Sequence, residues 1–370
     1  MYLFIISWLS TLPFIHFGGS YEGPKVFWFW GGGFVLSLYW INRLIRNTSL
    51  SLKSSDFLFL FWIVLLSVSS LIGVHPVQSI IGGSYRHQGV LFFITLFLVS
   101  LTIPVLKIGS RQLLYRAMLA GSVLESLLIL YEKLFMNVAR PIGTFGEPNA
   151  VAGFLSVSLY FILYEKRISV LVKGLLYFIV ALTIVATGSR TGLIVSLFIL
   201  LGPVISYFVK RKNNAVHLGL ILGVVASLGI SAYSYVKVVS ILRPVSTFEN
   251  RSEFWQTGVG ELKKSPVFGY GAESLEFVYD RAYKRISFPL ADLIIDRSHN
   301  IFLDVALWSG FVGLCVFLSW LASILYRGIL NHDYHGTVAL LAWLLFACFQ
   351  PVGVVQWLLL ILITTKHHVY

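Results

Sequence analysis

Apolar runs separated by short polar loops fill most of this chain. Because the hydrocarbon core of a bilayer is about 30 Å thick, a helix that crosses it needs roughly 20 mostly apolar residues. We therefore predict membrane-spanning helices over residues 2–17, 26–42, 57–74, 89–106, 113–131, 150–164, 168–187, 193–209, 216–236, 300–326, 336–349 and 353–365. The pattern indicates an all-α polytopic membrane helix bundle of about 12 transmembrane helices, built as a single transmembrane domain over residues 1–370.

One long polar stretch, residues 237–299, interrupts this pattern between the ninth and tenth spans. Within it, Asn250 followed by Glu253 resembles a capping box, and apolar residues then recur at helical spacing until Pro266. We expect an amphipathic helix there, at the membrane interface or over the bundle. A tight turn and a second helical stretch follow, so the long loop is predicted to be partly helical.

The composition supports a membrane location. Only 12% of the residues are charged and the mean hydropathy is +0.82, whereas soluble domains carry roughly twice that charged fraction. Such a chain needs lipid around it. The net charge of +12 does not indicate a nucleic-acid partner, because the Lys and Arg residues lie mostly in short loops between apolar runs, where they report topology.

These positive residues favour one set of alternating loops. One side has fourteen of them: Arg43, Arg46, Lys53, Lys107, Arg111, Arg116, Lys166, Arg167, Lys173, Lys210, Arg211, Lys212, Arg327 and Lys366. The short loops of the other side have five: Lys25, Arg86, Lys133, Arg140 and Arg190. Since cytoplasmic loops are enriched in Lys and Arg, we expect both termini in the cytoplasm and residues 237–299 as an extracytoplasmic loop.

The sequence gives no sign of a metal or disulfide framework. Cys315 and Cys348 both lie inside apolar runs, where cysteine behaves as a small buried hydrophobe. No His and Cys residues have the spacing of a zinc site. We therefore expect no metal and no cofactor.

Five polar motifs are predicted to lie on the extracytoplasmic side. They are residues 83–89 around Arg86, 140–149 with Arg140, 187–192 with Arg190, the single position Arg251, and 298–300 with His299. Each has an ordinary explanation: an Arg can reach to lipid headgroups, and Glu147 before Pro148 fits a helix start. Alternatively, the Gly- and Pro-rich turn within 140–149 presents backbone N–H groups to an anion.

Together the motifs place several Arg side chains and one His on one face of the bundle. Guanidinium binds phosphate oxygens bidentately and stays charged at every relevant pH. A helix N-terminus favours the neutral imidazole at His299, and a neutral imidazole can take a proton from a hydroxyl. This combination favours binding of a phosphate-bearing lipid.

The order of these motifs resembles that of the O-antigen ligase superfamily, which also holds O-antigen polymerases and bacterial protein O-oligosaccharyltransferases. The similarity runs from about residue 75 to 315 and rests on Gly143-Thr144-Phe145-Gly146-Glu147-Pro148-Asn149, Gly188-Ser189-Arg190-Thr191-Gly192, Arg251 before Trp255, Ser265-Pro266-Val267-Phe268-Gly269-Tyr270-Gly271 and His299-Asn300. Two positions depart from the family pattern: Glu147 stands where the family often has Asn, and Ser309 stands where an acidic residue often precedes the Gly.

The resemblance implies a GT-C-like, metal-independent and inverting glycosyltransferase at the outer face of the cytoplasmic (inner) membrane. Its donor would be a glycan on undecaprenyl diphosphate, and its acceptor a hydroxyl on a lipid A core sugar, another glycan or a protein. By carry-over from the family, Arg190 and Arg251 would hold the donor diphosphate and His299 would activate the acceptor. The further substrate-binding candidates in the same motifs are Arg86, Arg140, Asn149, Ser189 and Asn300.

Two alternatives stay open. An O-antigen polymerase or a protein O-oligosaccharyltransferase would use the same donor with a different acceptor, and no residue identifies the acceptor. A transporter of lipid-linked saccharides would more often show inverted repeats and charges near the bilayer midplane. We find no clear repeat, and the strong candidates for charges within spans are Arg116, Glu125 and Lys173.

Overall fold

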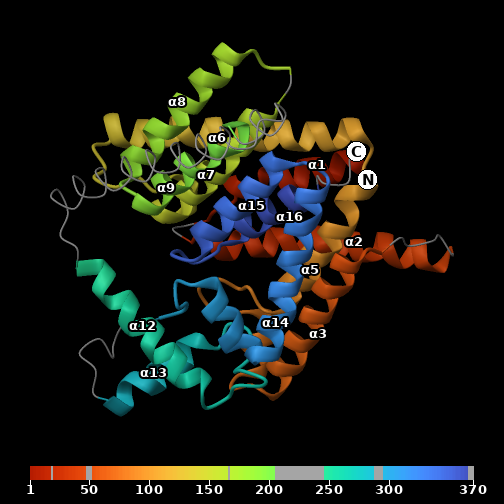
Figure 1. Cartoon of the computed structure of the whole chain (residues 1–370), viewed down its shortest axis with the longest axis vertical. Helices are drawn as coiled ribbons and strands as arrows, with labels where there is room; N and C mark the ends of the chain where they lie inside the picture. Colours follow the sequence, from red (N-terminus) through yellow and green to blue (C-terminus); the bar gives the residue numbers. More distant parts are fainter. Residues whose placement is uncertain (18–19, 47–51, 166, 205–245, 287–294, 366–370) are drawn as a thin grey trace, which may run out of the picture.

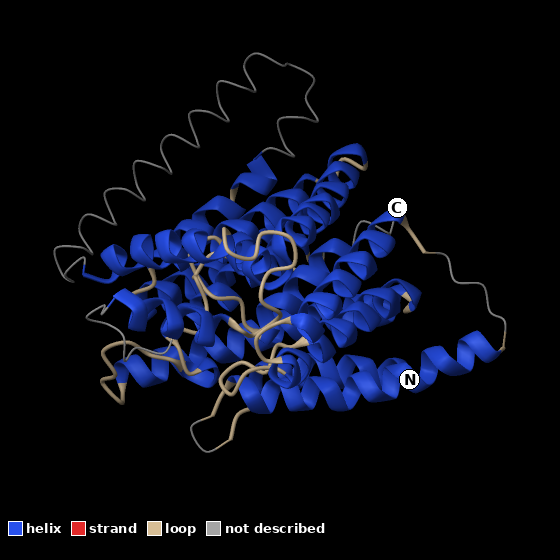
Figure 2. Cartoon of the chain, turned by 90° about the horizontal axis from the view of Figure 1, so that it is seen from below, coloured by secondary structure: helices blue, strands red, loops and turns tan. Residues whose placement is uncertain are grey.

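The structure, a computed structural model, describes residues 1–17, 20–46, 52–165, 167–204, 246–286 and 295–365. Within these ranges every regular element is a helix, as Figure 2 shows, and the single β pairing is an isolated bridge between Phe17 and Ser20. The part of the chain that is described is therefore all-α, as predicted.

The helices follow the apolar runs closely. The α-helices are α1 (Tyr2–Thr11), α2 (Glu22–Ile45), α3 (Ser54–Ile72), α4 (Pro76–Ile81), α5 (Val90–Thr102), α6 (Ile108–Leu134), α7 (Pro148–Tyr164), α8 (Val170–Thr187), α9 (Arg190–Ile199), α12 (Ser246–Leu262), α13 (Leu275–Ile286), α14 (Ile301–Leu330), α15 (Tyr334–Ala347) and α16 (Val354–Thr365). Three short 3-10 helices join them: η1 (Leu12–Phe14), η2 (Ile103–Val105) and η3 (Gly143–Phe145).

Four of these helices, α3, α6, α8 and α14, are long and apolar enough to cross a membrane. They are accompanied by shorter apolar stretches at Tyr2–Phe14, Val90–Val105, Pro148–Leu163, Arg190–Val204, Tyr334–Ala347 and Val354–Thr365. A helix lies on each predicted span except 216–236, which falls outside the described residues. The multi-pass, all-α membrane architecture is thus confirmed, while the count of twelve spans, the GT-C-like fold and the orientation stay predictions.

The helices of the long polar loop gather at one end of the molecule. In Figure 1, α12 and α13 lie together at the end opposite α6 and α8, and α14 runs between the two ends. Contacts join α12 and α13 to α14, which in turn packs along α3. The predicted loop helix is therefore placed against the bundle through α14.

The start of α12 differs from the prediction. The helix begins at Ser246, so Asn250 lies inside it and does not occupy the N-cap that the capping-box spacing indicated. The reason is that no Gly or Pro separates Ser246 from Asn250, so nothing stops the helix from extending to the earlier residue. The tight turn and the second helical stretch were predicted correctly, since Gly269 and Gly271 both adopt positive φ before α13.

Residues 265–271 dock onto a break inside α14. At the break, Gly310 has φ 67° and ψ −174°, a conformation that is essentially restricted to glycine. Three backbone hydrogen bonds of 2.7 to 3.0 Å join the loop to the break: Phe311 N to Pro266 O, Tyr270 N to Leu307 O, and Gly271 N to Trp308 O. From α3, Ser69 donates its hydroxyl to the carbonyls of Phe268 and Trp308. The break therefore attaches the loop to the membrane helices.

Side chains of α2 and α6 hold the Gly-rich turn before α7. The carboxylate of Glu132 accepts the backbone N–H groups of residues 142 and 143 at 2.9 and 3.1 Å. Both oxygens of Glu125 bind Thr144, one its N–H and one its hydroxyl, at 2.7 and 2.8 Å, and the buried Lys25 donates to the Thr144 carbonyl at 2.7 Å. These three N–H groups are occupied inside the protein and are not available to an anionic ligand, so at residues 142–144 the turn does not present them as the second interpretation expected. Glu125, a predicted charge within a span, serves this turn.

Candidate functional site

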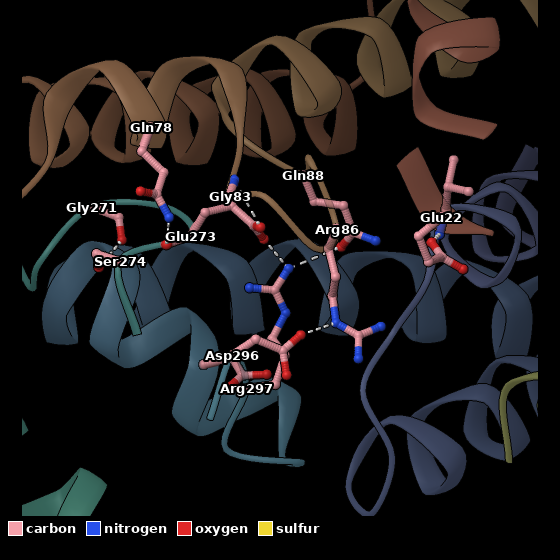
Figure 3. A network of polar contacts seen from close by, with 12 residues as sticks. Glu22, Gln78, Gly83, Arg86, Gln88, Gly271, Glu273, Ser274, Asp296 and Arg297 are labelled. Carbon is pink, nitrogen blue, oxygen red and sulfur yellow. Dashed lines mark hydrogen bonds and ion pairs between the residues drawn. The ribbon is translucent and has the colours of Figure 1, made fainter. Parts of the chain in front are cut away.

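Two buried ion pairs fix the segment that leads into α14. Arg86, in the loop before α5, pairs through its Nε with Asp296. The next residue, Arg297, pairs with Glu273 and donates to Gln88 Oε1 at 3.2 Å. Figure 3 shows the two pairs side by side, with the Arg86 guanidinium extending past Asp296. This segment is therefore held by the loop before α5 and by Glu273, which lies just before α13.

The following residues are held just as firmly. Ser298 donates its N–H and its hydroxyl to Asp304 at 2.7 and 2.6 Å, and its carbonyl accepts the indole N–H of Trp255 of α12 at 2.9 Å. Asn300 is the N-cap of α14, and its Oδ1 accepts the N–H groups of residues 302 and 303 at 3.0 and 3.3 Å. The side-chain oxygen of Asn300 is thus used in capping the helix.

His299 is set apart from these neighbours. Its backbone has φ 59°, an uncommon conformation for a residue other than glycine that often marks functional sites. Its ring packs on Phe254 of α12 with centroids 6.4 Å apart, and its Nδ1 is buried without a hydrogen-bond partner among the described residues. A strongly anchored frame therefore presents one imidazole that has no internal bond to make.

The surroundings keep this imidazole neutral. The pKa of His299 is lowered to about 4, mainly by burial, with the positive charges of Arg251 and Arg86 adding to this effect and the carboxylate of Asp296 opposing it. The expected neutral state is thus found, but its causes are burial and nearby arginines, more than the helix N-terminus. The imidazole at neutral pH is an acceptor for a proton.

Arg86, Arg251 and His299 share one electrostatic environment. Burial lowers the pKa of Arg251, and the carboxylate of Glu147 opposes this. Burial would also lower the pKa of Arg86, but Asp296, Glu22 and Glu147 raise it overall. Glu147, at the N-cap of α7, thus acts on both arginines. Arg251 and Arg86, from two separate segments, thus both act electrostatically on His299, from a third.

Arg190, Arg140 and Ser189 form a second group, at the turn between α8 and α9. Gly188 ends α8 with φ 67°, and the hydroxyl of Ser189 caps α9 by accepting the Gly192 N–H at 3.2 Å. Arg190 is the first residue of α9. Arg140 donates from Nε to the carbonyl of Thr187 at 3.3 Å. The fold thus brings Arg140 to the turn that carries Arg190, and Ser189 is a helix cap. The expected role of both arginines in substrate binding stays a prediction.

The loop between α15 and α16 connects the two groups. Gln350 donates to the hydroxyl of Thr191, next to Arg190, at 3.1 Å. Its neighbour Phe349 packs on Trp255 with ring centroids 6.3 Å apart, and Trp255 in turn donates to Ser298. The remaining candidate, Asn149, donates to Glu147 Oε1 at 3.4 Å, at the start of α7. The structure thus links Arg190 to the His299 segment through a short chain of contacts.

Sequence reasoning missed the ionic frame around His299. Asp296, Arg297 and Glu273 were not singled out, although Asp296 and Arg297 stand directly before Ser298-His299. Two adjacent opposite charges in front of an apolar span were an available signal. Their partners are 210 and 24 residues away in sequence, so the pairing itself required the fold.

No group of three or more His, Cys, Asp or Glu side chains within the described ranges is arranged to hold a metal ion. The catalytic chemistry that the described residues offer is anion binding by guanidinium groups and proton transfer at an imidazole.

The comparisons with known proteins support this assignment. Residues 175–318 match the family model described as O-antigen ligase. This stretch of the chain is similar to O-antigen ligases. The match includes Arg190, Arg251 and His299, and it ends within α14, beyond the Gly310 break. No curated protein matches the sequence. The resemblance drawn from the motifs is therefore confirmed for this stretch of the chain.

Proposed function

We propose that this protein transfers a glycan from undecaprenyl diphosphate to an acceptor hydroxyl, at the outer face of the cytoplasmic membrane. The observation that carries the proposal is the neutral His299, which lies within electrostatic reach of Arg251 and Arg86 and whose Nδ1 has no hydrogen-bond partner among the described residues, inside a stretch similar to O-antigen ligases. We propose a lipid or glycan acceptor, with a protein acceptor as the alternative.

The proposed reaction is a single displacement. The acceptor oxygen attacks the anomeric carbon while its proton passes to His299, and the diphosphate leaves with the bonding electrons. Arg190 and Arg251 would stabilise the charge that develops on the diphosphate, so their contribution is larger in the transition state than in the ground state. One in-line attack inverts the anomeric configuration. Membrane lipids would surround the donor, and no nucleic acid, metal or cofactor takes part.

Substitution of the three residues tests the proposal. Arg190→Ala and Arg251→Ala should each lower the transfer rate about 100- to 1000-fold, and His299→Ala about 100- to 10,000-fold. Lys263→Ala is the matched control, because it removes an exposed cation directly after α12 and should leave the rate unchanged. Transfer of a lipid-linked donor glycan would be followed with purified protein in proteoliposomes, after equal membrane accumulation is confirmed. Wild-type transfer by Arg190→Ala or Arg251→Ala would refute the diphosphate roles.

The same reconstitution separates this function from its rivals. Release of undecaprenyl diphosphate means transfer, whereas intact donor that changes sides means transport. Activity should persist in EDTA, and a loss that Mg²⁺ restores would indicate a metal enzyme. Offering a core-type glycolipid, a repeat-unit glycan and a peptide in parallel would distinguish ligase, polymerase and protein glycosyltransferase.

A further inference from the structure

We propose that Asp296 is a positioning residue that couples the donor site to the acceptor-activating base, by holding Arg86 through Nε and by offsetting the positive charge around His299. This inference rests on the proposed function and adds to it a carboxylate that none of the family motifs contains. The contact between Asp296 and Arg86 is the first observation that supports this role.

Arg86 is oriented by only one of its nitrogens. The ion pair with Asp296 uses Nε, and among the described residues no hydrogen bond involves its Nη1 or Nη2. The residue is 6% exposed, so the pair fixes its direction within the protein. Since a guanidinium binds phosphate through a fork of two nitrogens, the contact to Asp296 leaves that fork available to a diphosphate. Figure 3 shows the terminal nitrogens of Arg86 directed away from the Arg297 pair and toward the side of Glu22.

Asp296 also acts on His299, three residues further along. The charged groups that face this imidazole are Arg251 of α12, Arg86 of the loop before α5, and Asp296 of its own segment. The two arginines and burial lower its pKa, and Asp296 alone among the three groups raises it. When His299 takes the acceptor proton, the imidazolium forms beside two guanidinium groups, and the Asp296 carboxylate is the charge that stabilises it.

The same carboxylate stays ionised while doing so. Burial would raise the pKa of Asp296, but Arg86 and Arg297 lower it overall. The segment cannot shift easily, because Arg297 is clamped by Glu273 and Gln88 on one side of Asp296 and Ser298 is clamped by Asp304 beyond it. Asp296 therefore keeps a fixed negative charge that acts both on Arg86, the cation proposed to face the donor, and on His299, the proposed base.

Asp296→Asn tests this role with three measurements. It should weaken binding of undecaprenyl diphosphate about 10-fold, because Arg86 loses its orientation. It should also lower kcat about 10-fold, because the imidazolium loses a stabilising charge, and a factor of ten corresponds to about one pKa unit at the base. The acidic limb of the kcat–pH profile should move to lower pH, because the carboxylate that raises the pKa of His299 is gone. Asp296→Glu should restore part of both losses.

Glu273→Gln is the matched control, because it breaks the neighbouring buried ion pair of the same segment. It should leave the acidic midpoint of the profile where the wild type has it. In an Arg86→Ala background, Asp296→Asn should no longer change diphosphate binding but should still lower kcat. The inference is overturned if Asp296→Asn and Glu273→Gln have the same pH midpoint and the same binding. Failure of the proposed function would look different, since the wild type would then show no transfer or His299→Ala would retain it.

Discussion

Replacing Gly310 by alanine tests how the loop of residues 265–271 is attached to α14. A Cβ at this position would lie 2.0 Å from the carbonyl oxygen of Val267 and 2.7 Å from the backbone nitrogen of Phe268. These are backbone atoms, so no side chain can rotate away, and the positive φ of 67° is strained for alanine regardless of space. The loop has to leave its place on the helix.

The cost can be worked from the contacts. Strained backbone of this kind costs about 1–3 kcal/mol, and the three backbone hydrogen bonds across the break contribute about 0.5–1.5 kcal/mol each. Together they predict a loss of about 3–7 kcal/mol in the free energy of unfolding. Glycan transfer should fall as well, because the loop leads directly to Glu273, which holds Arg297 beside the His299 segment.

Gly260→Ala is the control. This glycine lies in α12, and a Cβ there would meet no atom within 4 Å, so the change should be neutral or stabilise the helix by up to about 1 kcal/mol. Both variants would be solubilised in detergent, heated, and scored for the fraction that stays monodisperse in size-exclusion chromatography. If Gly310→Ala loses its monodisperse fraction at the same temperature as Gly260→Ala and the wild type, the break is not what attaches the loop.

Three further predictions concern single side chains. The kcat/KM for transfer should stay level from neutral pH down to about 5 and fall as the pH drops through about 4, because protonated His299 cannot accept a proton. A midpoint of this fall near pH 6.5 would contradict the burial of His299. Asn300→Ala should lower the free energy of unfolding by about 0.5–2 kcal/mol, because the helix cap is lost. Asn300→Asp should keep both stability and transfer. A selective loss of transfer in Asn300→Asp would instead make this residue a substrate ligand. Glu125→Ala should cost about 1–3 kcal/mol in a thermal unfolding assay, because it leaves the buried N–H of Thr144 without an acceptor, while the Thr144 hydroxyl keeps its bond to the Pro13 carbonyl. Glu125→Gln retains an acceptor and should cost less. Equal losses in the two variants would argue against the bond.

The apolar pattern was sufficient to predict where the helices lie. Hydropathy reports burial in lipid or protein directly, so a helix is found on every described span, and the start of α7 at Pro148 follows from local preferences. Those preferences failed where they were weak, as at Asn250, since a two-residue capping pattern does not stop a helix that can extend further.

The candidate site was less accessible to sequence reasoning, for a physical reason. Ionisable side chains buried beside a membrane need partners, and those partners come from distant segments, as Asp296 does for Arg86. A cap such as Ser189 has the same sequence signature as a ligand-binding hydroxyl. Hydropathy does not reveal the conformation of Gly310, because this glycine lies inside a mostly apolar run.

The break at Gly310 also determines how deep the first part of α14 can lie in a membrane. A continuous helix of 30 residues would rise about 45 Å, whereas the hydrocarbon layer is about 30 Å thick. Residues 311–330 alone rise about 30 Å, which is enough to cross it, so residues 301–309 are free to stand at the level of the lipid headgroups. A phosphate anchored by a long polyprenyl tail travels at this same level, and it would reach the imidazole by sideways diffusion within its own leaflet.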